Sequence, residues 1–254
     1  MVKRIIGMIG LYDNCQVVQT AQFKPKNFVH ACASHAVKKF CNEGIDEILI
    51  LDLTKNGIEI NKIQNTIKLI VEKCFIPVIF GGNLKNTLFI DKLFNLGVDR
   101  VLINTEIFRD EKIIDQLILK YGSQALVAGI DCDQFCLNSF CFNKLEEKNH
   151  IMVSDHIDFL SSKGVTEILF NSPNNDGLRK GYAINENTVG LLKKLDKKSM
   201  STIFMGGAWD VEHFLKAAEL GISGLAAANC FHYKEAFPLV IKKYLSENNF
   251  DILY

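Results

Sequence analysis

This sequence lacks several features, and each absence excludes a class of protein. The 29 Lys and Arg residues balance the 29 Asp and Glu residues, and no basic stripe runs along the chain. Nothing in the charge pattern therefore favours nucleic acid as a partner. No apolar run reaches the ~18 residues that a spanning helix needs, and the first residues lead into a strand pattern rather than a signal-peptide core. The sequence predicts a cytoplasmic protein with no nucleic-acid or membrane partner.

The eight cysteines do not form a metal-binding signature. In a cytosolic protein we expect them to be reduced thiols that pack like small apolar residues. Cys132, Cys136 and Cys141 form the only cluster, and their spacing matches no zinc motif. A loop with incidental thiols explains the cluster better than a metal site, so we expect neither a metal nor a cofactor.

Short apolar runs alternate with segments of helical spacing along the whole chain. Continuous apolar runs are typical of parallel strands that are covered on both faces. Several of the intervening segments end at a glycine just before the next run, as helices often do. The runs are RIIGMI (4–9), EILILDL (47–53), PVIFGG (77–82), RVLIN (100–104), ALVAGID (125–131), EILFN (167–171), STIFMGG (201–207) and GLAAAN (224–229).

Eight such β–α units predict a (β/α)8 TIM barrel with two-fold half-barrel symmetry. The doubly wound alternative would place a glycine fingerprint after the first run, and none is there. The halves resemble each other: GIDEILILDLTKNG (44–57) aligns with GVTEILFNSPNNDG (164–177) without a gap. A repeat this long indicates two half-barrels of four units. Because no linker interrupts the pattern, we expect a single domain over residues 1–254.

Two glycine pairs, Gly81-Gly82 and Gly206-Gly207, follow equivalent runs in the two halves. At the carboxyl end of a barrel strand, glycine lets backbone N–H groups approach an anion closely, and the following helix N-terminus adds a favourable dipole. Tight βα turns alone would explain one pair. Two related pairs favour a ligand with a phosphate at each end, spanning the barrel mouth. Further hydrogen-bonding residues follow in Asn104, Thr105 and Asn229.

Three aspartates stand at or after strand ends, where barrel enzymes have their active sites. Asp131 ends the fifth run, and a carboxylate that emerges from an apolar strand is partly desolvated and suited to general acid–base chemistry. The alternative for Asp131 is a cap for the following loop. Asp52 ends the second run and Asp176 follows the sixth. Both suit loop positioning or the binding of a ribose hydroxyl better than proton transfer.

Four charged residues of alternating sign stand at the opposite ends of the strands: Arg4, Glu47, Arg100 and Glu167. Exposed charges there are usually solvated, and an exposed ion pair contributes about 0–1 kcal/mol. If all four converge at the bottom of a narrow barrel, they form instead a paired ring that can plug or gate the axial core. The sequence alone leaves both possibilities open.

Eight segments in order along the chain resemble one protein family. They are KRII (3–6), GIDEILILD (44–52), FIPVIFGG (75–82), GVDRVLIN (97–104), GSQALVAGID (122–131), GVTEILFNSPNNDGLRKGY (164–182), FMGGAWDVEHFLKA (204–217) and AANCFH (227–232). Together they are similar to the cyclase subunit of imidazole glycerol phosphate synthase, the HisF-type barrel of histidine biosynthesis. The resemblance implies that a partner glutaminase delivers ammonia through the barrel. That ammonia reacts with a ribulosyl bis-phosphate to give imidazole glycerol phosphate and an aminoimidazole carboxamide ribotide.

The resemblance also implies roles by position. Asp131 matches one of two catalytic aspartates, and Asp99 matches a position where the partner docks. One phosphate site falls on Gly82, Asn104 and Thr105, and the other on Gly177 and Gly207. The salt-bridged ammonia gate of the family corresponds to Arg4, Glu47, Arg100 and Glu167.

The predicted catalytic face departs from the family pattern. Where the family has C-L-D-V, this chain has Met8-Ile9-Gly10-Leu11, so the other catalytic aspartate is missing. The lysine of the first loop is Gln19, and the lysine two positions after the retained aspartate is Asp133. The third glycine of the first phosphate loop is Asn83. Asp13 would replace the missing acid only if an inserted residue turned it inward.

This asymmetry leads to three hypotheses. In the first, the chain still receives ammonia but acts on another phosphorylated or nucleotide-linked sugar, as a paralogue that serves acetamidino-sugar synthesis for bacterial surface glycans. Its VVQTAQF segment (17–23) resembles such relatives. The second is a true histidine-pathway cyclase, a lyase with a displaced acid, and the third is a non-catalytic subunit that activates the glutaminase. We favour the first, because losing one partner of an acid–base pair typically costs about 10²–10⁴-fold in rate.

Overall fold

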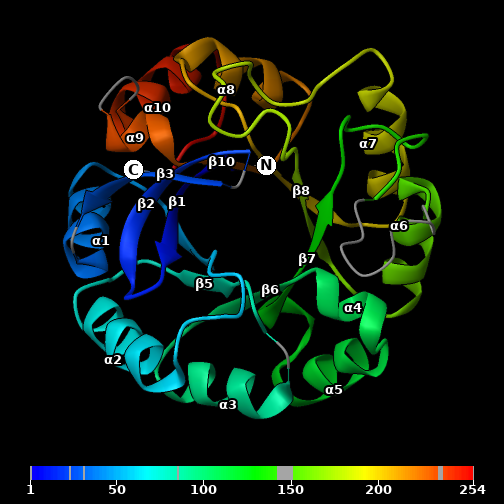
Figure 1. Ribbon diagram of the computed structural model, residues 1–254. Helices are drawn as coiled ribbons and strands as arrows, with labels where there is room; N and C mark the ends of the chain where they lie inside the picture. Colours follow the sequence, from blue (N-terminus) through cyan, green and yellow to red (C-terminus); the bar gives the residue numbers. More distant parts are fainter. Residues whose placement is uncertain are drawn as a thin grey trace.

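The computed structural model describes residues 2–22, 24–30, 32–84, 86–141, 151–233 and 237–253. Parallel strands close into a barrel, because β1 pairs with β10 as well as with β4. Figure 1 shows these strands around a central axis, with the helices outside. The predicted (β/α)8 barrel is therefore confirmed. Its strands are β1 (Arg4–Tyr12), β4 (Glu47–Asp52), β5 (Val78–Gly81), β6 (Arg100–Ile103), β7 (Leu126–Asp131), β8 (Glu167–Asn171), β9 (Ser201–Met205) and β10 (Gly224–Ala227).

Amphipathic helices cover the outside of the barrel. In α2 (Ile60–Val71), the buried residues Ile63, Ile67 and Ile70 recur at helical spacing and face the strands. In the described part of the chain, no helix is both long enough and apolar enough to cross a membrane. The other helices are α1 (Ala33–Asn42), α3 (Thr87–Asn95), α4 (Thr105–Arg109), α5 (Lys112–Tyr121), α6 (Val153–Ser162), α7 (Thr188–Lys197), α8 (Val211–Glu219), α9 (Asn229–His232) and α10 (Pro238–Glu247), with a 3₁₀ turn at Ser123–Ala125.

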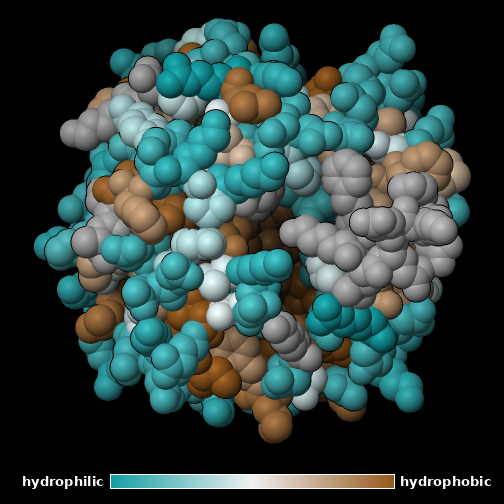
Figure 2. Space-filling view, in the orientation of Figure 1, coloured by the Kyte–Doolittle hydropathy of each residue, from teal (hydrophilic) through white to brown (hydrophobic). Residues whose placement is uncertain are grey.

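The barrel strands contribute to two apolar layers, because successive side chains point to opposite faces. The outward-facing side chains pack against the helices in one large cluster. The inward-facing side chains fill the barrel interior, and Figure 2 shows apolar residues at the bottom of a hollow near the axis. We call this inner cluster the interior column. It consists of Ile6, Met8, Leu49, Leu51, Ile79, Leu102, Val127, Leu169, Ile203, Met205 and Ala226.

A β-hairpin extends the first strand, which the sequence analysis did not predict. The first strand was expected over residues 4–9, but β1 continues to Tyr12. β10 pairs only with the lower half of β1, over Arg4–Gly7, which leaves the upper half with an open edge. β2 (Gln16–Ala21) covers that edge in antiparallel pairing, with Gly10 opposite Val18, and β3 (Lys24–His30) pairs with β2. The hairpin thus supplies hydrogen bonds that the backbone of β1 would otherwise lack.

Candidate functional site

The four charged residues at the amino ends of the strands form a closed ring. Arg4 donates from Nη1 to Glu47 Oε2 at 3.0 Å and from Nη2 to Glu167 Oε1. Arg100 donates in the same way to Glu47 Oε1 at 3.1 Å and to Glu167 Oε2. Each carboxylate accepts from both guanidiniums, so the charges alternate around the barrel axis. Of the two possibilities that the sequence left open, the structure has the paired ring.

Burial and charge act against each other on the carboxylates of this ring, which are nearly inaccessible to solvent. Burial raises the pKa of Glu47 above its ordinary value, although the neighbouring guanidiniums oppose it. Burial also acts to raise the pKa of Glu167, but there the two guanidiniums and a hydrogen bond from Ser201 outweigh it and lower the pKa. The Ser201 hydroxyl donates to Glu167 Oε1 at 2.8 Å. Opening the ring requires the separation of buried ion pairs, which is costly.

The residue assigned to partner docking, Asp99, lies at the same end of the barrel. It is exposed, and its Oδ2 accepts the backbone N–H of Val78 at 2.8 Å, at the start of β5. Phe75 lies just before that strand and is 95% exposed. Aromatic residues are enriched at protein–protein interfaces, and an exposed phenylalanine is unusual elsewhere on a protein surface.

At the carboxyl ends of the strands, the Asp131 carboxylate accepts two amide N–H groups. Asn104 Nδ2 lies 2.9 Å from Oδ2, and Asn171 Nδ2 lies 2.6 Å from Oδ1. Thr105, the residue after Asn104, begins α4. The buried Oδ1 of Asn171 has no hydrogen-bond partner among the described residues, and turning the amide around would set this oxygen against the carboxylate. Sequence reasoning missed Asn171, although it aligns with the inward-facing Leu51 in the internal repeat, and a polar residue there is a usable signal.

Leu53 occupies the space next to the position of the missing acid. A Cβ atom on Gly10 would lie 2.6 Å from Leu53 Cδ1, so a larger residue at Gly10 requires Leu53 to move. Asp13 lies exposed in the turn between β1 and β2, where its backbone N–H donates to Thr54 Oγ1 at 2.9 Å. Asp13 therefore lies in the hairpin turn and is not turned into the barrel.

Asp52 holds the loop that follows β4, and Asn83 connects the first glycine loop to it. The two carboxylate oxygens of Asp52 accept backbone N–H groups from Thr54 at 3.0 Å and from Ile58 at 2.9 Å. Asn83 Nδ2 donates to the carbonyl oxygen of Thr54 at 2.9 Å. Gly82 has a φ of +85°, and a Cβ there would lie 2.3 Å from the Asp52 carbonyl oxygen, so only glycine fits. These contacts correspond to the loop-positioning role for Asp52.

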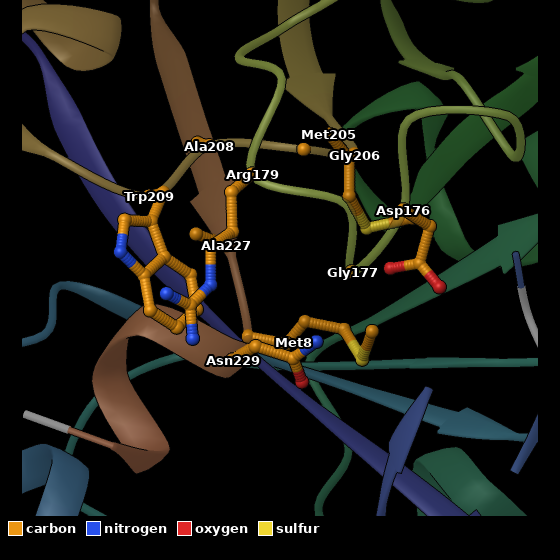
Figure 3. A pocket seen from close by; sticks show the side chains of 12 residues that line it. Met8, Asp176, Gly177, Arg179, Met205, Gly206, Ala208, Trp209, Ala227 and Asn229 are labelled. Carbon is orange, nitrogen blue, oxygen red and sulfur yellow. The ribbon is translucent and has the colours of Figure 1, made fainter. Parts of the chain in front are cut away.

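The second glycine loop lines a small pocket that opens to solvent, which Figure 3 shows. We call it the rim pocket. Met8 and Met205 of the interior column line its inner side. Asp176 is buried and accepts from Thr20 Oγ1 at 2.6 Å, while Asn229 Nδ2 donates to the Thr20 carbonyl oxygen at 3.0 Å. Strand β2 thus fixes two residues of the pocket. The predicted phosphate-binding glycines Gly177, Gly206 and Gly207 also line it.

The cysteine cluster lies after β7, where Cys132 and Cys141 form an isolated antiparallel bridge. Burial raises the pKa of the Cys141 thiol to about 12. Cys132 and Cys136 are buried as well, and all three are free thiols. These thiols pack as small apolar groups within the segment that follows Asp131.

The fold and this site define a class of protein: a TIM barrel with two glycine loops and an aspartate at its mouth, and a charged ring at its other end. The model of a family described as histidine biosynthesis protein matches residues 4–236. The chain is 31% identical to the imidazole glycerol phosphate synthase subunit HisF of Campylobacter concisus, over 98% of this chain and 97% of that protein. It is 30% identical to a Campylobacter jejuni protein provisionally named imidazole glycerol phosphate synthase subunit hisF2, over 99% of each. The chain belongs to this family, and it is a HisF-like synthase subunit.

Proposed function

We propose that this chain is the ammonia-using synthase subunit of a glutamine amidotransferase. A glutaminase docks at the end of the barrel that carries Asp99, and its ammonia passes the charged ring and the interior column to a phosphorylated substrate at the mouth. The observation that supports this most directly is the closed ring beneath an apolar column. Neutral ammonia crosses apolar surroundings at a far lower desolvation cost than ammonium or a metal cation does. The column therefore favours ammonia over charged species.

The proposed substrate is a phosphorylated or nucleotide-linked sugar other than the ribulosyl bis-phosphate of the standard cyclase. Two features of the mouth support this. Leu53 stands against Gly10 where the resemblance implies a carboxylate, and Asp13 is exposed at the tip of a turn. Asp131 remains the general acid–base group, held by its two asparagines. We infer that the chain is a divergent paralogue that serves acetamidino-sugar synthesis for surface glycans.

The variant Arg100→Glu tests the ammonia route. The chain is combined with its glutaminase, and the amount of product is measured per glutamine consumed. We expect Arg100→Glu to release ammonia into solution and to form much less product per glutamine, while activity with added ammonium salt persists and shows that the mouth is intact. Lys62→Glu, which reverses a charge in the exposed pair with Glu59, is the matched control. Wild-type coupling in the Arg100 variant refutes the route.

A standard histidine-pathway cyclase is the second candidate, because the chain aligns with the HisF protein of Campylobacter concisus over nearly all of both chains. Expression in a histidine auxotroph that lacks its own cyclase subunit separates the two candidates. We expect no growth without histidine, since the mouth lacks the second carboxylate. Growth would establish the standard reaction and reject the proposed substrate.

A further inference from the structure

A guanidinium group stacked on an indole ring stands at the edge of the rim pocket. Arg179 Cζ lies 3.6 Å from the centroid of the Trp209 ring, which is the distance of direct stacking. Figure 3 shows the two side chains together on one side of the pocket and the Asp176 carboxylate on the other. Arg179 and Trp209 both line the pocket. The stack is therefore part of the pocket wall.

The two residues of the stack lie on segments that pack tightly against each other. The backbone N–H of Trp209 donates to His213 Nδ1 at 3.2 Å, and His213 also forms a capping box with Asp210 at the start of α8. Gly181, two residues after Arg179, packs against the same histidine ring, because a Cβ there would lie 2.7 Å from its Cδ2 atom. The loop that carries Arg179 is thus fixed to the helix start that carries Trp209, and the stack is preorganised for binding.

Arg179 has no carboxylate partner in the described ranges of the chain, and it is exposed. The indole covers one face of the guanidinium group, while its N–H donors lie in the plane of the group and point outward along its edge. A guanidinium that is held flat and keeps its edge free can donate to two phosphate oxygens at once. A lysine ammonium lacks this planar pair of donors. The neighbouring glycine loop, at Gly206 and Gly207, is the second predicted phosphate site.

The rim pocket has opposite polarity on its two sides. Arg179 supplies donors on one side, and Asp176 supplies a carboxylate acceptor on the other. A free inorganic anion uses only the donor side and is repelled by the carboxylate. A phosphate attached to a polyol uses both sides, because the sugar hydroxyls donate to the carboxylate. The pocket therefore favours a phosphorylated sugar over inorganic phosphate.

We propose that Arg179, held flat on Trp209, binds the phosphate of a substrate whose sugar hydroxyls reach Asp176. Arg179 is then a specificity residue for the phosphate group, and Trp209 is a positioning residue that acts through it. A simple sugar phosphate and a nucleotide share this chemistry, and a nucleotide can also stack its base on the outer face of Arg179. This inference rests on the proposed function, since it names the contacts at one of its two phosphate sites.

Trp209 is the only tryptophan of the chain, so its fluorescence reports on the stack itself. Ribose phosphate, uridine monophosphate and inorganic phosphate are titrated separately into the full chain, with calorimetry in parallel. We expect both organic phosphates to change the Trp209 emission and to bind about tenfold or more tightly than inorganic phosphate. Arg179→Gln is expected to weaken the binding of both organic phosphates by about ten- to a hundredfold. Lys180→Gln makes the same change of charge one residue later, and we expect its affinity for both organic phosphates to stay within about twofold of wild type.

Two more variants separate a role in binding from a role in structure. Arg179→Lys keeps the charge but loses the planar fork, so we expect it to recover only part of the affinity. We expect the affinity of Trp209→Leu for the organic phosphates, measured by calorimetry, to lie between that of wild type and that of Arg179→Gln. In this variant the Arg179 guanidinium is present but is no longer held in place. If uridine monophosphate binds more tightly than ribose phosphate, a base stacks on the outer face of Arg179 and the substrate is a nucleotide. Equal binding indicates a simple sugar phosphate as the substrate.

The outcomes that contradict the proposal differ from those that contradict the proposed function. If Arg179→Gln binds the organic phosphates as wild type does, the role of Arg179 is refuted while the phosphate site and the proposed function stand. If wild type binds no phosphate compound, the second phosphate site fails, and the proposed function fails with it.

Discussion

The two ends of the barrel follow the family pattern to different degrees. At the amino end, Arg4, Glu47, Arg100 and Glu167 have the expected signs and close the ring that the resemblance implies. At the carboxyl end, Gly10 stands where the resemblance implies a second carboxylate, and a hairpin covers the edge of β1. The interior column lies between the two ends. Under the proposed function, the comparison teaches that the delivery of ammonia and the reaction at the mouth can change separately in this fold.

Removal of the Asp131 carboxylate is expected to have the largest effect. Asp131→Asn keeps the shape of the side chain but replaces a carboxylate that accepts from Asn104 and Asn171. We expect ammonia-dependent product formation to fall by about 10²–10⁴-fold, because the proposed acid–base group is lost. Glutamine hydrolysis by the complex, measured in the same samples, is expected to continue. Unchanged product formation would instead support a subunit that only activates the glutaminase.

The ring at the other end is expected to affect stability most. Glu167→Gln leaves Arg4 and Arg100 each with one of their two carboxylate partners in a buried setting. Breaking a buried ion pair costs about 3–5 kcal/mol, and partial exposure of the Arg4 side chain reduces this to about 2–3 kcal/mol in the free energy of unfolding. Urea denaturation measures the difference. The control Glu59→Gln, in an exposed pair, is expected to change stability by less than about 0.5 kcal/mol. Equal effects of the two substitutions would show that the ring is not a buried network.

Introducing a carboxylate at position 10 tests whether Leu53 occupies the space that this carboxylate needs. We expect Gly10→Asp to lower the free energy of unfolding by about 1–3 kcal/mol, because its Cβ collides with Leu53. Leu53→Ala in the Gly10→Asp background is expected to recover part of this loss, with a coupling energy of at least about 0.5 kcal/mol in the double-mutant cycle. Strictly additive effects in urea denaturation would mean that the two positions do not compete for space.

The pH dependence of stability distinguishes the two carboxylates of the ring. The pKa of Glu167 is lowered in the folded protein, so its contribution is present above the ordinary value of 4.5 and is lost as the pH falls through the folded pKa. The advantage of wild type over Glu167→Gln should therefore shrink below about pH 4.5. The pKa of Glu47 is raised by burial, so wild type should gain stability relative to Glu47→Gln as the pH falls toward 4.5. Urea unfolding across this range checks both signs, and parallel responses would contradict the difference between the two sites.

The sequence was sufficient to predict the barrel and to place the four charged residues at the amino ends of its strands. The apolar runs mark the strands, and in a closed parallel barrel the starts of the strands lie at the same end. It did not predict the β2–β3 hairpin, whose pairing depends on an edge of β1 that is open only because β10 is short. The contacts of Thr20 with Asp176 and Asn229 depend on that hairpin. The stack of Arg179 on Trp209 joins two loops far apart in the sequence, so no local pattern encodes it.

The source of the nitrogen in the product tests the central claim most directly. The chain and its glutaminase are given glutamine labelled in its amide nitrogen, together with an excess of unlabelled ammonium in solution, and the isotope content of the product is measured by mass spectrometry. If ammonia travels inside the barrel, the wild-type product carries the label despite the unlabelled excess, and Arg100→Glu loses this preference. A wild-type product with the isotope ratio of the solution would contradict passage through the ring.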